Sequence, residues 1–188
     1  MSEWGPLAAL AGTWEGNDGL DVSFHNVDGE VGKTGYFEKV EMKPFGPVEN
    51  GGQVLFGLDY RMAAWRHGEE QQNPFHTEVG YWLWDAAASQ VMRCFMIPRG
   101  AVLIAGGTCT ADSREFTLEA SLGQSTYGIL ENLYLNAHSS TRRYDVTVTV
   151  HDDGAWTYEE DTLVVLDAMG GQELHHTDRN TLRQVGPA

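Results

Sequence analysis

The sequence predicts an all-β protein that folds as an up-and-down antiparallel β-barrel of about ten strands with one short helical segment. Apolar residues recur mostly at every second position, which is the period of a strand with one buried face. Val, Tyr, Trp, Thr and Phe gather in short runs separated by Gly, Pro, Asn and Asp. Strands joined by short turns form a meander, and closing a meander removes its exposed edges, so we expect a barrel.

Ten runs of this kind follow one another along the chain. Two of the turns between them are sharply marked: "IPRGA" at 97–101 combines Pro and Gly, and "HDDGAW" at 151–156 carries an Asp-Gly hairpin signal. We place the strands near residues 11–17, 33–43, 53–66, 75–85, 90–97, 101–109, 115–121, 140–151, 155–166 and 172–184.

Three segments depart from the strand pattern. "PLAALAG" at 6–12 predicts an opening helical turn, and "YGILENLYL" at 127–135 predicts either one short helix or a strand-to-strand crossing. "FGPVENGGQ" at 45–53 is too short to divide domains and predicts a long hairpin loop. We therefore expect residues 1–188 to form a single β-barrel domain.

Composition and charge limit the partners of this domain. With 188 residues, 41% of them apolar, the chain can bury a core without disulfides, so Cys94 and Cys109 are expected to be free thiols. A net charge of -15 excludes nucleic acid and anionic membranes, which would repel the surface. The start "MSEWGPLAALAGTW" lacks a basic signal, and no apolar stretch reaches the roughly 20 residues of a membrane span, so we expect a cytoplasmic protein.

A barrel of ten strands leaves room for a small ligand unless large side chains fill it. Counting by twos along "LHHTDRNTL" turns His176 inward, together with Asp178 and Asn180, between two leucines. His175 turns outward, so the two histidines cannot share one metal ion. His176 is the leading candidate for a ligand contact, and Asp178 or a cross-strand hydroxyl is expected to satisfy it if no ligand does.

Four motifs, in this order, resemble the nitrobindin family and its bacterial fatty-acid-binding-protein-like relatives: "LAGTWEG" from Leu10, "HTEVGYWLWD" from His76, "IPRG" from Ile97 and "HTDRNTL" from His176. The resemblance implies a lipocalin-like barrel that binds heme b, with His176 as the ligand of the heme iron. It also implies nitric oxide or peroxynitrite chemistry, and only in that case an enzyme, similar to a peroxynitrite isomerase.

The strand "TEVGYWLWD" carries large side chains on both faces. Trp82 and Trp84 share one face with Glu78, whereas Val79, Tyr81 and Leu83 occupy the other. The sequence leaves open which of the two faces points into the barrel. The two tryptophans are candidates for a cavity wall against a flat ligand, with core filling as the alternative.

Two further interpretations of the barrel remain open. Arg99 lies at a hairpin tip and is either a solvated turn residue or a gate at the barrel mouth, and Arg142 and Tyr144 are expected to share a strand face. Arg142 with Tyr144, or Arg99, would hold the head group of a fatty acid or another carboxylated lipid. The second alternative is a filled barrel that contacts a partner protein. The partner expected first is a small hydrophobic ligand, bound by a monomer or a homodimer.

Overall fold

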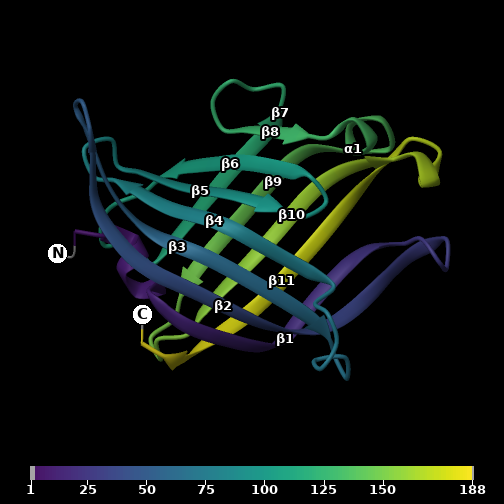
Figure 1. The fold of residues 1–188 in the computed structure, drawn as a ribbon, viewed down its shortest axis with the longest axis horizontal. Coiled ribbons are helices and arrows are strands. Elements are labelled where there is room, and N and C mark those ends of the chain that lie inside the picture. Colours follow the sequence, from purple (N-terminus) through teal and green to yellow (C-terminus); the bar gives the residue numbers. More distant parts are fainter. Residues whose placement is uncertain (1–2, 188) are drawn as a thin grey trace.

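Strands close into one barrel in the computed structural model, which describes residues 3–187 (Figure 1). Around the barrel the order is β1, β11, β10, β9, β7, β8, β6, β5, β4, β3, β2. The strands are β1 (Gly12–His25), β2 (Glu30–Asn50), β3 (Gln53–Arg66), β4 (His76–Asp85), β5 (Gln90–Ile97), β6 (Ala101–Thr108), β7 (Glu115–Leu122), β8 (Gly128–Glu131), β9 (Ser139–Val150), β10 (Trp156–Leu166) and β11 (Gln172–Gly186). The all-β barrel that the sequence predicts is confirmed, with one strand more than the ten placed above.

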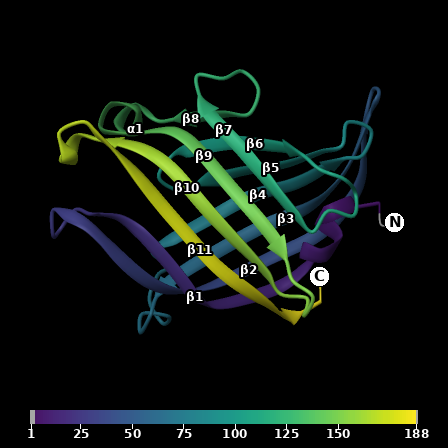
Figure 2. The ribbon, with the colours of Figure 1, turned by 180° about the vertical axis from the view of Figure 1, so that it is seen from behind.

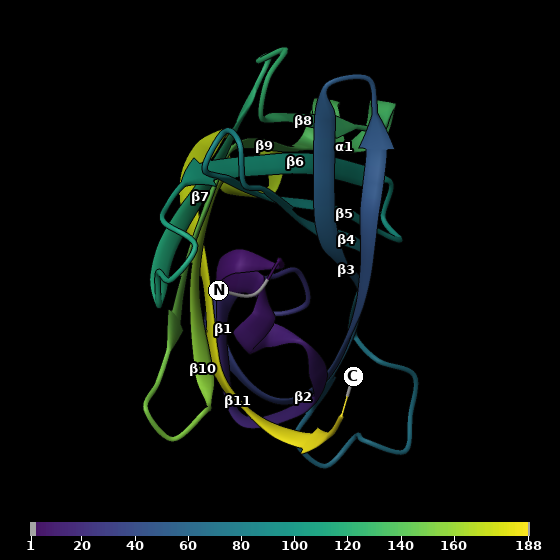
Figure 3. The same ribbon diagram turned by 90° about the vertical axis from the view of Figure 1, so that its left-hand side faces the viewer.

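Short helices lie at opposite ends of the barrel. The 3₁₀ helix η1 (Gly5–Leu10), the expected opening turn, lies inside the ring of strands at one end (Figure 3). Its Leu7 and Leu10 side chains are fully buried. The helix α1 (Leu133–His138) lies at the other end, near the turn between β10 and β11 (Figure 1). One end of the barrel is therefore plugged by η1, and the other carries the mouth.

The segment expected as a helix or a crossing contains both. β8 runs parallel to β7 and antiparallel to β6, and α1 follows it after Asn132, whose side chain caps the helix by accepting from the Leu135 backbone. Figure 2 shows β7 beside β9, with which it pairs over most of its length. The meander is therefore interrupted at β8, and the barrel is mixed instead of purely antiparallel.

The prediction of a long hairpin loop at 45–53 is wrong. β2 and β3 keep pairing as far as Asn50 and Gln53, apart from an irregularity at Gly46 and Pro47. Gly51, with a positive φ of 62°, lies in the two-residue connection that remains. The residue types that indicate a loop instead accommodate a bulge within a long hairpin.

A bulge in β1 shapes the interior. Asn17 and Asp18 have no pairing partners on either neighbouring strand, and the glycines on both sides of them leave space for other side chains. A Cβ atom at Gly19 would lie 2.4 Å from the Tyr36 ring, and one at Gly16 would lie 2.6 Å from the Asn180 amide. Glycine at these two positions therefore lets Tyr36 and Asn180 occupy the inner wall.

Large apolar side chains fill the barrel at the η1 end. The core cluster there includes the tryptophans of β1, β4 and β10 and the aliphatic side chains that face them. Its most deeply buried members include Trp14, Trp82, Met42, Leu58, Val91, Leu118 and Leu182. Toward α1 the inward side chains become polar or leave space, so the remaining volume lies on that side. Among the described residues no helix is both long and apolar enough to span a bilayer.

Candidate functional site

A cavity of about 900 Å³ occupies the α1 half of the barrel. Its mouth is bordered by the β1–β2 turn, the end of β5 and α1, and its walls come from β1–β6 and β8–β11. A volume of this size is typical of sites for drug-sized molecules. The interior is therefore not filled by its aromatic residues, which argues against the filled-barrel alternative.

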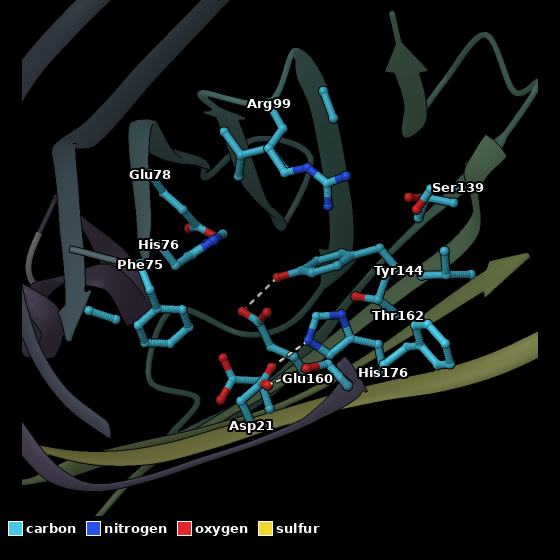
Figure 4. Close-up of a pocket in the computed structure, with 18 of the residues that line it drawn as sticks. Asp21, Phe75, His76, Glu78, Arg99, Ser139, Tyr144, Glu160, Thr162 and His176 are labelled. Atoms are coloured by element: carbon cyan, nitrogen blue, oxygen red, sulfur yellow. Dashed lines mark hydrogen bonds and ion pairs between the residues drawn. The ribbon is translucent and has the colours of Figure 1, made fainter. Parts of the chain in front are cut away.

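His176 stands on the cavity wall near the mouth, as the two-residue period predicts. Its Nε2 atom lies 2.5 Å from Oδ1 of Asp21 on β1, and the other Asp21 oxygen accepts from Ser23 at 2.6 Å. The expectation that Asp178 satisfies His176 is wrong, because in the closed barrel β1 lies beside β11 and brings Asp21 closer. Figure 4 shows His176 with Asp21 on one side and Tyr144 on the other.

The histidine and the aspartate stabilise each other's charged forms. Burial disfavours the charged ring, but the hydrogen bond to Asp21 and the negative charges of Asp21 and Asp178 outweigh it and raise the pKa of His176. Burial alone would raise the pKa of Asp21, whereas the hydrogen bond and charge of His176 lower it. His175 lies on the outer face and bonds Asp161 at 2.8 Å, so the two histidines are separated as expected.

A buried arginine, Arg93 on β5, occupies the inner part of the cavity wall. Its Nη2 atom donates to Tyr60 at 3.0 Å and to Glu78 at 2.6 Å, and its Nη1 atom donates to Tyr144 and Glu160. Tyr60 donates in turn to Glu78 at 2.7 Å, and Tyr144 donates to Glu160 at 2.9 Å. We call these five residues the arginine cluster.

The arginine cluster has a hydrogen for each of its hydrogen bonds. Its six contacts need six hydrogens, and the two Nη atoms supply four while the two phenols supply two. Burial would raise the pKa of Glu78, but the charge of Arg93 and a hydrogen bond from His76 lower it. The cluster is therefore an ion-paired unit in which Arg93 is held between Glu78 and Glu160.

A second polar group, the tyrosine cluster, consists of Glu38, Tyr158, Tyr36, Asp178 and Asn180. The Tyr158 hydroxyl contacts Glu38 at 2.8 Å and the Tyr36 hydroxyl at 2.7 Å, and the Tyr36 hydroxyl contacts Asp178 at 2.5 Å. Asn180 donates to Glu38 at 2.9 Å. The chain of contacts therefore joins two carboxyl groups through two phenols.

The hydrogen bonds of the tyrosine cluster need one more hydrogen than its hydroxyl groups supply. The three contacts from Glu38 through the two phenols to Asp178 need three hydrogens, and the phenols supply two. One carboxyl group must supply the third. Consistent with this count, burial raises the pKa of Glu38 to about 7, against the hydrogen bonds from Tyr158 and Asn180. Burial and then the charge of Glu160 raise the pKa of Asp178 to about 8.

The prediction that Arg142 and Tyr144 share a strand face is wrong. Between β9 and β10 the register shifts, so that Leu163 pairs with Arg143 but Val164 pairs with Thr141. This bulge turns Arg142 out to solvent, while Tyr144 and Thr141 both line the cavity. The arginine that meets Tyr144 is Arg93 instead.

The remaining predicted residues fall into three settings. Trp82 lines the cavity, whereas Trp84, on the same inward face, is buried against η1, where a Cβ at Gly5 would meet its ring. Asn180 is buried behind the wall in the tyrosine cluster. Arg99 is exposed at the mouth and its side chain extends over the cavity (Figure 4), and its role as a gate stays a prediction.

The residues that sequence reasoning missed share one signal. Each is a charged residue at an inward position of a period-two strand: Asp21 in "LDVSF", Glu38 between Tyr36 and Val40, Arg93 between Val91 and Phe95, and Glu160 two after Tyr158. A charge in the apolar register of a strand marks a buried polar group that needs partners. The partners themselves come from other strands, so only the fold identifies them.

The fold and the cavity define the class: a closed β-barrel with an interior site for a small molecule. The chain belongs to the family of THAP4-like, heme-binding beta-barrel domains, whose model matches residues 3–184. This confirms the nitrobindin-like family that the sequence motifs indicate. The chain is also similar to the crystal structure of Rv2717c from M. tuberculosis, with 19% identity, a TM-score of 0.63, and coverage of 95% of this chain and 97% of that chain. At this level of identity, the similarity shows a common fold. No curated protein matches the chain.

Proposed function

We propose that the barrel binds heme b and that His176 is the ligand of the heme iron. One observation carries the proposal: Nε2 of His176 is committed to Asp21, and Nδ1 has no hydrogen-bond partner among the described residues. Metal-binding histidines usually donate one ring N–H to a carboxylate and present the other nitrogen to the metal. The pair therefore has one ring nitrogen held by a carboxylate and the other without a partner in the described part of the chain, which is the arrangement of a metal-binding histidine.

The residues around His176 fit a flat apolar group with charged edges. Apolar side chains line the cavity near its mouth, and the cations Arg66 and Arg99 stand at its rim, where they would face the propionates of heme. The apolar side chains are Phe24, Ile97, Leu103, Ile129, Val164 and Leu174.

Bound heme would supply an iron centre that binds diatomic molecules, and the resemblance to nitrobindins predicts nitric oxide or peroxynitrite as its partner. The protein's own contribution is the state of His176. Iron needs an unprotonated ring nitrogen, whereas Asp21 favours the doubly protonated ring. Binding should therefore release a proton and strengthen as the pH rises toward the pKa of His176.

A hemin titration followed by absorption tests the proposal. Wild-type apo protein should give a saturable Soret shift that His176→Ala abolishes. His175→Ala is the matched control, because His175 is the adjacent histidine on the outer face, and it should bind hemin as the wild type does. If His176→Ala keeps the wild-type spectrum, or no variant binds hemin, the heme assignment is wrong.

The alternative of a carboxylated lipid has weaker support. Arg142 faces solvent, and Arg93, which does meet Tyr144, is already paired with Glu78 and Glu160. A fatty-acid carboxylate would have to displace one of these glutamates from the buried guanidinium. Mass spectrometry of an organic extract of the purified protein tests this alternative, and a stoichiometric fatty acid would restore it.

A further inference from the structure

Negatively charged side chains outnumber the free cations along the cavity wall. Eight carboxyl groups line the cavity: Asp28, Glu131 and Asp167 at its edge, and Asp21, Glu38, Glu78, Glu160 and Asp178 on the strands. Among the described residues that line it, Arg93 is the buried arginine, and it is held by Glu78 and Glu160. The lining histidines His76 and His176 are likewise held by Glu78 and Asp21, and the other lining arginines, Arg66 and Arg99, stand at the mouth. A molecule that enters beyond the rim therefore meets carboxyl groups, while each buried cation already has a carboxylate partner.

Two buried N–H donors on the same wall have no acceptor. The Nε atom of Arg93 and the Nε1 atom of Trp82 make no hydrogen bond among the described residues, although their side chains are 4% and 1% exposed. The two groups are neighbours, since the Arg93 guanidinium carbon lies 5.2 Å from the Trp82 ring centre. Trp156, which also lines the cavity, has a third unpartnered donor at Nε1. A buried donor without an acceptor costs free energy, so this wall favours an acceptor atom.

We propose that the inner cavity binds uncharged apolar molecules that carry one oxygen acceptor, such as long-chain alcohols or ketones, and rejects the corresponding carboxylates. The apolar side chains near the mouth contact the hydrocarbon body, and the oxygen accepts from Trp82 or Arg93 once that side chain turns, because neither donor atom is exposed in the free cavity. A carboxylate would offer the same acceptor but would add a negative charge beside Glu78 and Glu160. Fatty-acid carriers of similar shape would need the opposite arrangement, with an unpaired arginine inside.

The selectivity follows from how the arginine cluster is built. Glu78 and Glu160 neutralise Arg93 while leaving its Nε atom unpaired, so the guanidinium offers a hydrogen bond without a net attraction for anions. The four rings around its central carbon, those of Tyr60, Trp82, Phe95 and Tyr144, restrict its movement toward a charged ligand. The proposal concerns the inner wall and does not depend on heme.

Decan-1-ol and decanoate bound to the apo protein at pH 8 provide the test, because they differ only in the head group. Displacement of an uncharged fluorescent dye should show decanol binding at least roughly tenfold more tightly than decanoate. Glu160→Gln removes one carboxylate from Arg93 and should strengthen decanoate binding by about tenfold. Glu159→Gln is the matched control, because it makes the same charge change on the outer face, and it should leave both affinities unchanged.

The donor is tested separately by Trp82→Phe, which keeps an aromatic ring but removes the Nε1–H group. It should weaken decanol severalfold and leave decane, which has no oxygen, unaffected. Equal binding of decanol and decanoate to the wild type would overturn the proposal, as would failure of both to bind. Because these measurements use apo protein, failed hemin binding and failed alcohol binding are separate results. Circular dichroism melts of each variant verify that the barrel is intact.

Discussion

The Nε2 atom of His176 lies 2.5 Å from the Asp21 carboxylate, although the two residues are 155 positions apart in the chain. Closure of the barrel brings them together, because β1 and β11 are the first and last strands and pair directly. The contact fixes the ring at the mouth of the cavity and leaves its other nitrogen for a ligand. If heme binds as proposed, the aspartate would act on the iron through the histidine, as a positioning residue.

Asp21→Asn tests that role. The amide cannot favour the charged ring as a carboxylate does, so the pKa of His176 should fall and hemin affinity should drop by roughly 10- to 100-fold. Because protons then compete with iron only at lower pH, the rise of hemin affinity with pH should also move to lower pH. Hemin titrations at several pH values measure both effects. Asp161→Asn, which removes the partner of the outward His175, is the control and should change neither.

The stability of the same pair depends on pH in two directions. The raised pKa of His176 means that its contribution is fully present below about 6.5, the ordinary histidine value, and is lost as the pH rises through the folded-state pKa. The lowered pKa of Asp21 means that its contribution is present above about 4 and is lost as the pH falls through the folded-state pKa. In His176→Gln both dependences should disappear from urea unfolding curves, and their persistence would show that other groups cause them.

The missing hydrogen of the tyrosine cluster predicts a neutral carboxyl group inside the protein near pH 6. Infrared spectra should show the carbonyl band of a protonated carboxyl group at this pH. Glu38→Gln should weaken the band, because it removes one of the two carboxyl groups with a raised pKa and its amide supplies the third hydrogen itself. Tyr144→Phe is the control, since the arginine cluster needs no extra proton, and it should keep the band. A wild-type spectrum without the band would contradict the count.

Glu38 also predicts how stability changes with pH. Its pKa is raised from 4.5 to about 7, so between these values the folded protein holds a proton that the unfolded chain has released. The free energy of unfolding should therefore fall by about 3 kcal/mol as the pH rises across this window. Glu38→Gln should reduce the loss recorded from pH 5 to 8 by that amount, leaving the part that the raised pKa of Asp178 causes, whereas Glu119→Gln, on the outer face, should keep the whole loss.

Replacing Arg93 should be far more damaging than replacing the arginine that the sequence suggested. Arg93→Met leaves Glu78 and Glu160 buried without their cation, which costs about 3–5 kcal/mol. Arg142→Met changes an exposed side chain and should stay within about 0.5 kcal/mol of the wild type. Chemical denaturation measures both. Equal stability of the two variants would mean that the arginine cluster contributes nothing.

The β1 bulge supports the site sterically. Gly19→Ala places a Cβ atom 2.4 Å from the Tyr36 ring, so the ring must move away from its partners. The overpacking should cost about 1–3 kcal/mol in thermal or chemical unfolding. Gly52→Ala is the matched control, because nothing lies within 4 Å of its Cβ position, and it should unfold like the wild type. A stable Gly19→Ala variant with an unchanged infrared carboxyl band would show that Tyr36 adapts freely.

Much of the fold is local in origin and was accessible from the pattern of residues. Alternation along "LHHTDRNTL" separates His176 from His175 because a strand turns successive side chains to opposite faces. The two places where alternation misleads are bulges, at Arg142 in β9 and after Phe45 in β2. A bulge adds one residue to one strand and reverses the facing of those beyond it, and it depends on the partner strand.

The sequence by itself therefore determined the barrel, its family and the inward histidine, because strand period, turn residues and motif order are properties of short segments. Only the tertiary structure decided the partners: Asp21 for His176, Arg93 for Tyr144, and the two phenols that join Glu38 to Asp178. These pairs join strands that are distant along the chain. Barrel closure decides which side chains are buried together, and this sets their charges. No local sequence pattern encodes these contacts.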